Sequence, residues 1–171
     1  MKARILSSIG VFVASTFAQA VLNSESGFGT LYYDVEDVYG CQNNFSIQNE
    51  GPVQCNFFTS LSLDQMNTNY VVAMNRTLLA DDLAKYCGKK VIVTSNGVQS
   101  NLPLFIGDGC ARCAGGPSTN TVWNPNGAPG LDFSYTVAQE LNSNACFFGH
   151  FDITWGIVDE TLYSFDTNGL C

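Results

Sequence analysis

Hydrophobic and polar positions alternate over several short stretches of the chain, and each stretch predicts a β-strand. In residues 151–158 (FDITWGIV) every second side chain is large and apolar. This is the period of a strand with one face in the core, and it places Trp155 there. Residues 28–35 (FGTLYYDV) are rich in aromatic and β-branched side chains, and residues 70–74 (YVVAM) form a short apolar run. We expect strands in all three stretches.

A hairpin is predicted between residues 90 and 106. Residues 90–95 and 98–106 are two strand-like stretches joined by Asn96-Gly97. This dipeptide tolerates the positive φ angles of a tight type I′ turn. We therefore expect the two stretches to pair as antiparallel strands.

Two short helices are predicted among the strands. Leucines and a tyrosine make a helical stripe in residues 78–86. Ser134 can cap a second helix, in which Val137 and Leu141, four residues apart, face inward.

Two long stretches show no period and are expected to be loops. Residues 36–68 are polar, and residues 107–130 are rich in glycine, proline and asparagine. Because short strands dominate the remainder, the pattern predicts a mainly β fold, a small closed or nearly closed barrel with two short helices. Periodicity alone does not choose its topology.

The only long apolar run of the chain is at its beginning. Lys2 and Arg4 precede an apolar stretch, residues 5–17, and Ala18-Gln19-Ala20 has the small residues that signal peptidase accepts. We expect residues 1–20 to be a cleaved secretion signal. Residues 21–171 are then the length of a single domain, located outside the cell or in the cell wall.

Charge excludes one class of partner. Of the 7 basic residues, five remain in residues 21–171 against 15 acidic ones, a net charge of −10. Nucleic acid is therefore excluded as a partner, and no membrane partner is expected once the signal is removed.

All seven cysteines follow the expected cleavage point, where secretion favours disulfides. They are Cys41, Cys55, Cys87, Cys110, Cys113, Cys146 and Cys171. We expect three bridges and one odd thiol, for which the terminal Cys171 is a candidate, but the sequence leaves the pairing open. Cys110 and Cys113 have the spacing of a zinc knuckle or redox dithiol, yet no second such pair exists, and we expect no metal or other cofactor. Asn44 and Asn75 begin N-glycosylation sequons.

The order of six motifs is more specific than any one of them. They are GTLYYDV, YVVAMN, YCGKKVIV, GDGCARC, LDFSYTVAQEL and FDITWGIV. In this order, over about residues 27–160, the chain resembles the double-psi β-barrel group of RlpA-like, expansin-like, barwin-like and family 45 endoglucanase proteins, and most closely their secreted fungal and plant members. The resemblance implies a six-stranded, pseudo-twofold double-psi β-barrel, across whose groove a polysaccharide lies.

The resemblance also implies roles for three aspartates. Asp34 matches the general base of family 45 glucanases, Asp132 matches their general acid, and Asp108 matches an aspartate that lies beside it in expansins. An inverting glycosidase needs two carboxyl groups about 6.5 to 9.5 Å apart. Structural roles are the alternative for each: a solvated acidic loop for Asp34, a helix-terminus carboxylate for Asp132 and a loop-bracing hydrogen bond for Asp108.

Aromatic side chains offer a second kind of contact. Sugar rings stack on exposed aromatic rings, so Tyr32, Tyr33 and Trp123 are candidate polysaccharide-binding residues, and neutral β-glucan or chitin is the expected ligand. The triplet His150-Phe151-Asp152 matches an expansin motif in letters but not in position, and we treat it as chance.

Three departures from the family matter, of which one is an enlarged loop, residues 114–130. The extra cysteines that follow the first strand in family 45 glucanases are missing, which weakens the expectation of hydrolysis. The chain also ends eleven residues after Glu160, so we expect no second, carbohydrate-binding domain.

Three functions follow from these observations. The first is non-hydrolytic polysaccharide binding at the cell wall, in a groove lined by Asp132, Asp108 and Tyr33. The second is an endoglucanase that uses Asp34 as base and Asp132 as acid. The third is a protein-binding module, either a protease inhibitor or an effector that acts on a host plant, with the loop 114–130 meeting the partner.

Overall fold

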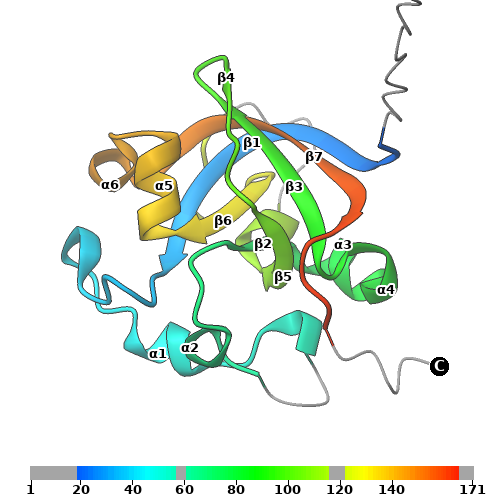
Figure 1. Ribbon diagram of the computed structural model, residues 1–171. Helices are drawn as coiled ribbons and strands as arrows, with labels where there is room; N and C mark the ends of the chain where they lie inside the picture. Colours follow the sequence, from blue (N-terminus) through cyan, green and yellow to red (C-terminus); the bar gives the residue numbers. More distant parts are fainter. Residues whose placement is uncertain (1–18, 57–60, 116–121, 166–171) are drawn as a thin grey trace, which may run out of the picture.

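The computed structural model describes residues 19–56, 61–115 and 122–165 (Figure 1). Most of the expected signal and Cys171 lie outside these residues. The described strands are β1 (Val21–Tyr33), β2 (Val71–Asn75), β3 (Lys89–Ser95), β4 (Val98–Gln99), β5 (Phe105–Cys110), β6 (Gly130–Ser134) and β7 (Phe151–Thr161). The helices are α1 (Ser46–Glu50), α2 (Leu63–Met66), α3 (Arg76–Asp81), α4 (Leu83–Tyr86), α5 (Tyr135–Leu141) and α6 (Ala145–Phe148), with 3₁₀ turns η1 (Gly40–Gln42), η2 (Gln54–Asn56) and η3 (Arg112–Ala114).

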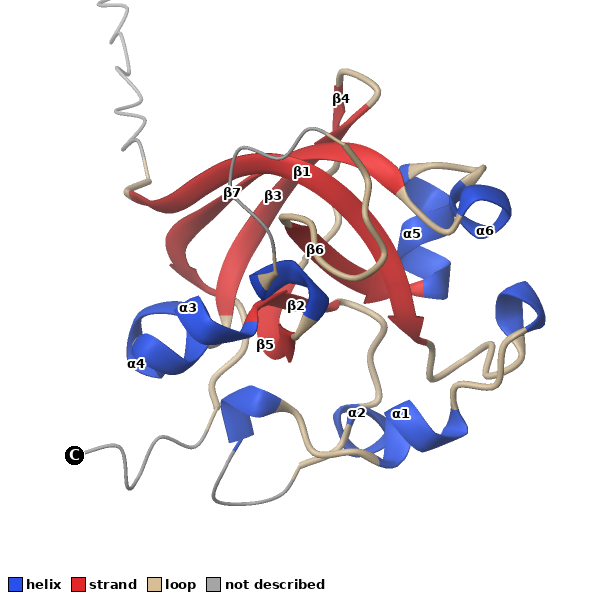
Figure 2. Ribbon diagram, turned by 180° about the vertical axis from the view of Figure 1, so that it is seen from behind, coloured by secondary structure: helices blue, strands red, loops and turns tan. Residues whose placement is uncertain are grey.

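The protein is mainly β, and its strands form one mixed sheet. The strand order is β4-β3-β5-β2-β6-β1-β7, and β7 also pairs with β3. The six strands other than β4 therefore form a closed circuit of pairings. Two pairs, β1–β6 and β2–β5, are parallel, and the others are antiparallel. In Figure 2 the long strands β1, β3 and β7 arch over the short strands β2, β5 and β6.

The hydrophobic core lies inside this circuit. The apolar side chains of β7 alternate as predicted, with Phe151, Ile153, Trp155 and Ile157 all buried. The side chains of Asp152 and Thr154, between them, are exposed. The prediction that Trp155 belongs to the core is thus confirmed.

The first strand is longer than the sequence predicts. It begins at Val21 rather than Phe28, because residues 21–27 pair with β7. This part of β1 carries the polar run Ser24-Glu25-Ser26, whose side chains are exposed. The extra residues form a strand through pairing with a distant segment, and their composition carries no strand signal.

The predicted hairpin is confirmed at its turn and wrong in its second strand. Asn96 and Gly97 have φ values of 51° and 78°, as a type I′ turn requires. The stretch 98–106 is not one strand, since β4 ends at Gln99 and β5 begins at Phe105. Pro103, which has no N–H to donate to a ladder, lies in the interruption.

The helix predictions hold, with more helix than expected. The stripe 78–86 folds as α3 and α4, separated at Asp82, and the Ser134 hydroxyl caps α5 by accepting a hydrogen bond from the Val137 N–H. The predicted loop 36–68 contains η1, α1, η2 and α2, each too short to show a period. None of the described helices is long and apolar enough to span a membrane.

Three disulfides are present in the described part of the chain, as predicted. Cys41–Cys146 joins η1 to α6, Cys55–Cys87 joins η2 to the residue after α4, and Cys110–Cys113 links the end of β5 to η3. The segment 107–130, expected to be loop throughout, therefore begins with part of β5 and a disulfide-closed 3₁₀ turn. It ends on the first residue of β6.

Candidate functional site

Strand register brings four residues from four strands into one row. Thr30 of β1 pairs with Asp132 of β6, which pairs with Ala73 of β2, which in turn pairs with Asp108 of β5. Residues directly opposite each other on paired strands point to the same face of the sheet. We call Thr30, Asp132, Ala73 and Asp108 the polar row. The small side chain of Ala73 lies at its centre, between the two carboxylates.

Asp132 is held by one cation and one hydroxyl. Nη2 of Arg112 donates to Oδ1 of Asp132 at 2.7 Å, and the Thr30 hydroxyl donates to the same oxygen. Nη2 also lies 3.1 Å from the Thr30 hydroxyl oxygen. The Arg112 and Asp132 side chains are 16% and 15% exposed, so a ligand can reach the ion pair. Asp132 does not cap α5, because Ser134 does so.

Arg112 is itself fixed from two other directions. Its Nη1 donates to the Ala128 carbonyl oxygen at 3.1 Å, and its guanidinium lies 5.0 Å from the centre of the Trp123 ring. The Trp123 ring stacks on His150 at 4.3 Å and meets the edge of Phe28. Trp123, predicted as a sugar platform, therefore positions Arg112, and its ring already contacts three protein groups.

Asp108 combines a bracing role with unusual electrostatics. Its Oδ1 accepts hydrogen bonds from the backbone N–H groups of Gln54 at 2.9 Å and Gly109 at 2.8 Å. Its Oδ2 accepts one from the Tyr32 hydroxyl at 3.3 Å. Burial raises the pKa of Asp108, as does the charge of Asp132, and the donors only partly offset this. The surroundings of Asp108 therefore favour its protonated form more than water does.

Tyr32 lies beside the row, next to a disulfide. Its side chain packs against Ala73, Cys110 and Cys113, and burial followed by the nearby Asp108 charge raises the pKa of its hydroxyl well above the usual value. The hydroxyl thus stays protonated and acts as a donor at any physiological pH.

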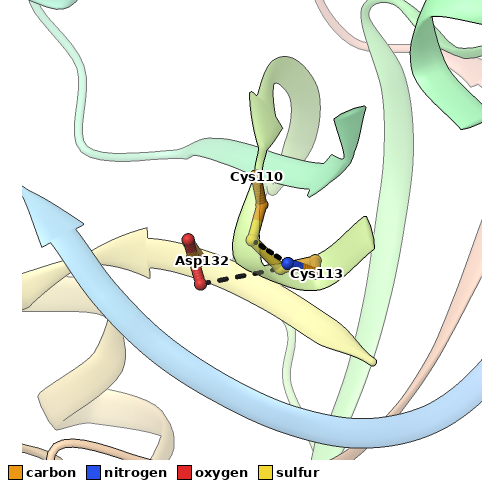
Figure 3. Close-up of side chains that lie close together, drawn as sticks. All are labelled: Cys110, Cys113 and Asp132. Carbon is orange, nitrogen blue, oxygen red and sulfur yellow. Dashed lines mark hydrogen bonds between the residues drawn. A yellow bond between two sulfur atoms is a disulfide. The ribbon is translucent and has the colours of Figure 1, made fainter. Parts of the chain in front are cut away.

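The Cys110–Cys113 disulfide lies against Asp132. Figure 3 shows Asp132 beside the two cysteines. Sγ of Cys113 lies 3.8 Å from Oδ1 of Asp132. One sulfur from each cysteine and one carboxylate oxygen lie within 4.8 Å of one another, a spacing that could hold a metal ion. While the sulfurs are bonded to each other, however, neither is a thiolate and neither is a metal ligand.

Asp34 is placed apart from the row, in a fully buried position. Its side chain is 0% exposed, and its carboxylate accepts hydrogen bonds from the backbone N–H groups of Glu36, Asp37 and Thr136. Asn69 donates to it as well. Burial would raise the pKa of Asp34, but the backbone donors outweigh it and hold the pKa below its usual value. Asp34 ties the end of β1 to the start of α5 and cannot reach a polysaccharide in this structure.

Tyr33 is also a core residue. It is 0% exposed, and its hydroxyl lies within hydrogen-bond distance of the carbonyl oxygens of Thr68 and Val71, 3.2 Å from each. Tyr33 therefore does not lie beside the polar row, whereas Tyr32 does.

The two sequons have different settings. Asn44 is exposed, whereas the Asn75 side chain is partly buried, and its Oδ1 accepts hydrogen bonds from the backbone N–H groups of Thr77 and Leu78 at the start of α3.

The sequence did not identify the partners that shape the site. Arg112, Thr30, Gln54 and His150 all contribute contacts, and none was predicted to. Of these four residues, Arg112 alone could have been recognised from the sequence as a candidate site residue. It is one of five basic residues after position 20 and lies between two cysteines.

Comparison of the sequence with protein-family models and with curated proteins finds no match in either set. The resemblance to the double-psi β-barrel group therefore stays a prediction from the ordered motifs.

Proposed function

We propose that this chain is a secreted double-psi β-barrel that binds neutral cell-wall polysaccharide without hydrolysing it, using the polar row together with Tyr32 and Arg112. The observation that carries this proposal is the register of Thr30, Asp132, Ala73 and Asp108 across four adjacent strands.

Strand connectivity supports the fold part of the proposal. The circuit strands β1, β2 and β3 can be matched in order with β5, β6 and β7. Under this match the parallel pair β1–β6 becomes β5–β2, which is also parallel, and the antiparallel pair β3–β5 becomes β7–β1, also antiparallel. The pairs β2–β6 and β3–β7 map onto themselves. This internal twofold relation is what the double-psi β-barrel resemblance implies.

The chemistry of the row suits a neutral, hydroxyl-rich ligand. Asp132 and Asp108 offer acceptor oxygens, and the Arg112 guanidinium offers donors. The ion pair cancels one charge, so an ionised ligand gains little there. Adjacent donors and acceptors of this kind can bind successive hydroxyl groups of a glucan or chitin chain.

The geometry does not favour the endoglucanase alternative. Its expected base, Asp34, is buried and bound by backbone donors. Its expected acid, Asp132, is the anionic half of an ion pair with Arg112 rather than a free proton donor.

Secretion is supported by the cysteines. Three disulfides in a chain of this size are typical of proteins that fold in an oxidising compartment. The apolar beginning of the sequence supplies the expected export signal.

A pull-down on insoluble cellulose and chitin tests the proposal. We expect the wild-type protein to be retained on at least one polymer with no soluble sugar released. Asp132→Asn should weaken retention about tenfold, because it removes the ion pair while keeping the side chain's size. Glu50→Gln, an exposed charge removal on α1, should bind like wild type. Wild-type protein that washes off every wall polymer would refute the proposal.

A second candidate function, binding to a protein partner, is favoured by exposed aromatic side chains. Tyr39 is 72% exposed, and Phe147 and Phe148 are 84% and 60% exposed. They flank the two ends of the Cys41–Cys146 bridge. Exposed apolar side chains that gather in one region mark interaction surfaces.

The two candidates predict opposite mutant behaviour. If the protein inhibits a papain-like protease through these aromatics, Phe147→Ser with Phe148→Ser should abolish inhibition, whereas Asp132→Asn should leave it unchanged. Absence of inhibition by the wild type would remove this candidate.

A further inference from the structure

We infer that Cys110, Cys113 and Asp132 form a zinc-binding site once the Cys110–Cys113 disulfide is reduced. This inference does not depend on polysaccharide binding, because it concerns the reduced form and a different ligand.

The Cys113 sulfur and the Asp132 carboxylate oxygen already have the separation that zinc requires, and the two sulfurs, now bonded to each other, move apart to that separation once they are reduced. The ligand atoms of the three side chains lie within 4.8 Å of one another, and Sγ of Cys113 lies 3.8 Å from Oδ1 of Asp132 (Figure 3). Tetrahedral zinc bonds of about 2.3 Å to sulfur and 2.1 Å to oxygen place such atoms about 3.6 Å apart. The two cysteines also have the two-residue spacing of zinc knuckles.

Neighbouring groups favour negative charge on both sulfurs. The Cys113 backbone N–H donates to Sγ of Cys110 at 2.9 Å, and Nη2 of Arg112 lies 3.3 Å from Sγ of Cys113. Hydrogen bonds and cations of this kind stabilise thiolates, which are the form that binds metal. Thiolates select zinc over calcium or magnesium.

Arg112 presently occupies the cation position of this cluster. Its guanidinium contacts both Asp132 and Cys113, and zinc would replace it there. The contacts of Arg112 with the Ala128 carbonyl and the Trp123 ring offer it an alternative position. The partial exposure of Arg112 and Asp132 provides the entry path, and water can complete the fourth coordination position.

A dithiol can reduce the Cys110–Cys113 disulfide. The dithiol transfers two electrons and two protons, its own sulfurs form a disulfide, and the Cys110–Cys113 bond breaks to two thiols. Zinc binding then releases those two protons to solvent, while Asp132 joins as a carboxylate.

Cobalt, a spectroscopic probe for zinc sites, tests the inference. The dithiol concentration is raised stepwise, and alkylation mapping identifies the disulfides that are reduced at each step. Wild type is then compared with the Cys110→Ser, Cys113→Ser double variant at the same dithiol concentration. We expect wild type to bind one more Co²⁺ per chain than the double variant, with a thiolate charge-transfer band that Zn²⁺ displaces. The oxidised protein should show neither.

Two single substitutions separate the metal site from general effects of reduction. Asp132→Asn should weaken Co²⁺ binding at least tenfold, because it removes the anionic oxygen ligand. Glu50→Gln should bind like wild type. The inference is overturned if wild type and the double variant bind equal metal, if Asp132→Asn has no effect, or if the bridge opens only when the circular-dichroism signal of the sheet is lost.

Discussion

Asp34 and Asp108 are two aspartates whose surroundings shift their pKa values in opposite directions. Burial raises the pKa of both, but at Asp34 the backbone donors of Asp37, Thr136 and Glu36 outweigh it, whereas at Asp108 burial prevails. A lowered pKa means that the folded state favours the ionised form of Asp34. Asp34 therefore stabilises the fold above about pH 3.9, the unfolded value, and loses this effect as pH falls through the lower folded value.

Asp34→Asn is expected to destabilise the protein by about 2 kcal/mol at pH 7, because hydrogen bonds from buried donors to a charged acceptor are lost. The difference from wild type should shrink below about pH 4, where the wild-type carboxylate also begins to protonate. Urea unfolding at several pH values measures this difference in the free energy of unfolding, and Asp64→Asn, at an exposed position, is the control. An equal loss at pH 7 and pH 3 would contradict the electrostatic explanation.

Asp108→Asn is expected to behave differently. Because the folded pKa is raised, ionisation of Asp108 opposes folding increasingly as pH rises from about 3.9 through that higher value. Asparagine removes this cost and keeps an oxygen for the Gln54 and Gly109 N–H groups. Unfolding experiments should find equal or higher stability at pH 7 and a flatter pH dependence than wild type. A loss above about 1 kcal/mol would show that the charge itself is needed.

Sequence reasoning named two members of the polar row but not the residues that contact them. Asp132 and Asp108 were found from motifs, but Arg112 lies 20 residues from Asp132 and 82 from Thr30, so no local pattern joins them. Tyr32 and Tyr33 could not be told apart as surface and core residues, because a register shift between Leu31 and Tyr33 breaks the simple alternation of β1.

At the scale of elements, local signals predicted turns and caps and failed at strand limits. Asn96-Gly97 and Ser134 act through their own backbone and the next few residues, so the sequence alone contains the information. The start of β1 depends on β7, more than a hundred residues away, and a polar stretch gives no hint of that pairing.

Two glycines with similar positive φ angles should respond differently to substitution. Gly88 and Gly97 have φ values of 74° and 78°. A Cβ on Gly97 would meet nothing within 4 Å, whereas one on Gly88 would lie 1.8 Å from the Tyr163 carbonyl oxygen. Gly97→Ala should cost about 1 kcal/mol through φ alone, and Gly88→Ala more than about 3 kcal/mol, because β3 and the segment after β7 must separate. Thermal unfolding compares the two, and equal losses would mean that the close approach is unimportant.

At the scale of the whole molecule, the disulfides differ in the length of chain that they close. The bridges Cys41–Cys146, Cys55–Cys87 and Cys110–Cys113 span 105, 32 and 3 residues. Loop-closure entropy predicts losses of about 4.7, 3.7 and 1.6 kcal/mol when each pair is replaced by serine. Urea unfolding of the three double variants checks this order, and a larger loss for Cys110–Cys113 than for Cys41–Cys146 would indicate that packing around Asp132 dominates.

The mainly β character and the number of bridges were predictable, because alternation and cysteine count are properties of the chain itself. The pairing partners of the cysteines and the closure of β3 on β7 were not, since both depend on which distant segments meet in the folded molecule.

Closure of the strand circuit also bears on self-association. Of the described strands, β4 alone has a strand neighbour on only one side, and it is two residues long with Val98 71% exposed at the hairpin. Residues 21–27 of β1 also pair on one side only, with β7, and they carry the exposed charge of Glu25. Intermolecular strand addition, the usual beginning of β-aggregation, therefore has two places to start, one very short and one polar and charged. We therefore expect the folded protein to resist assembly through strand pairing.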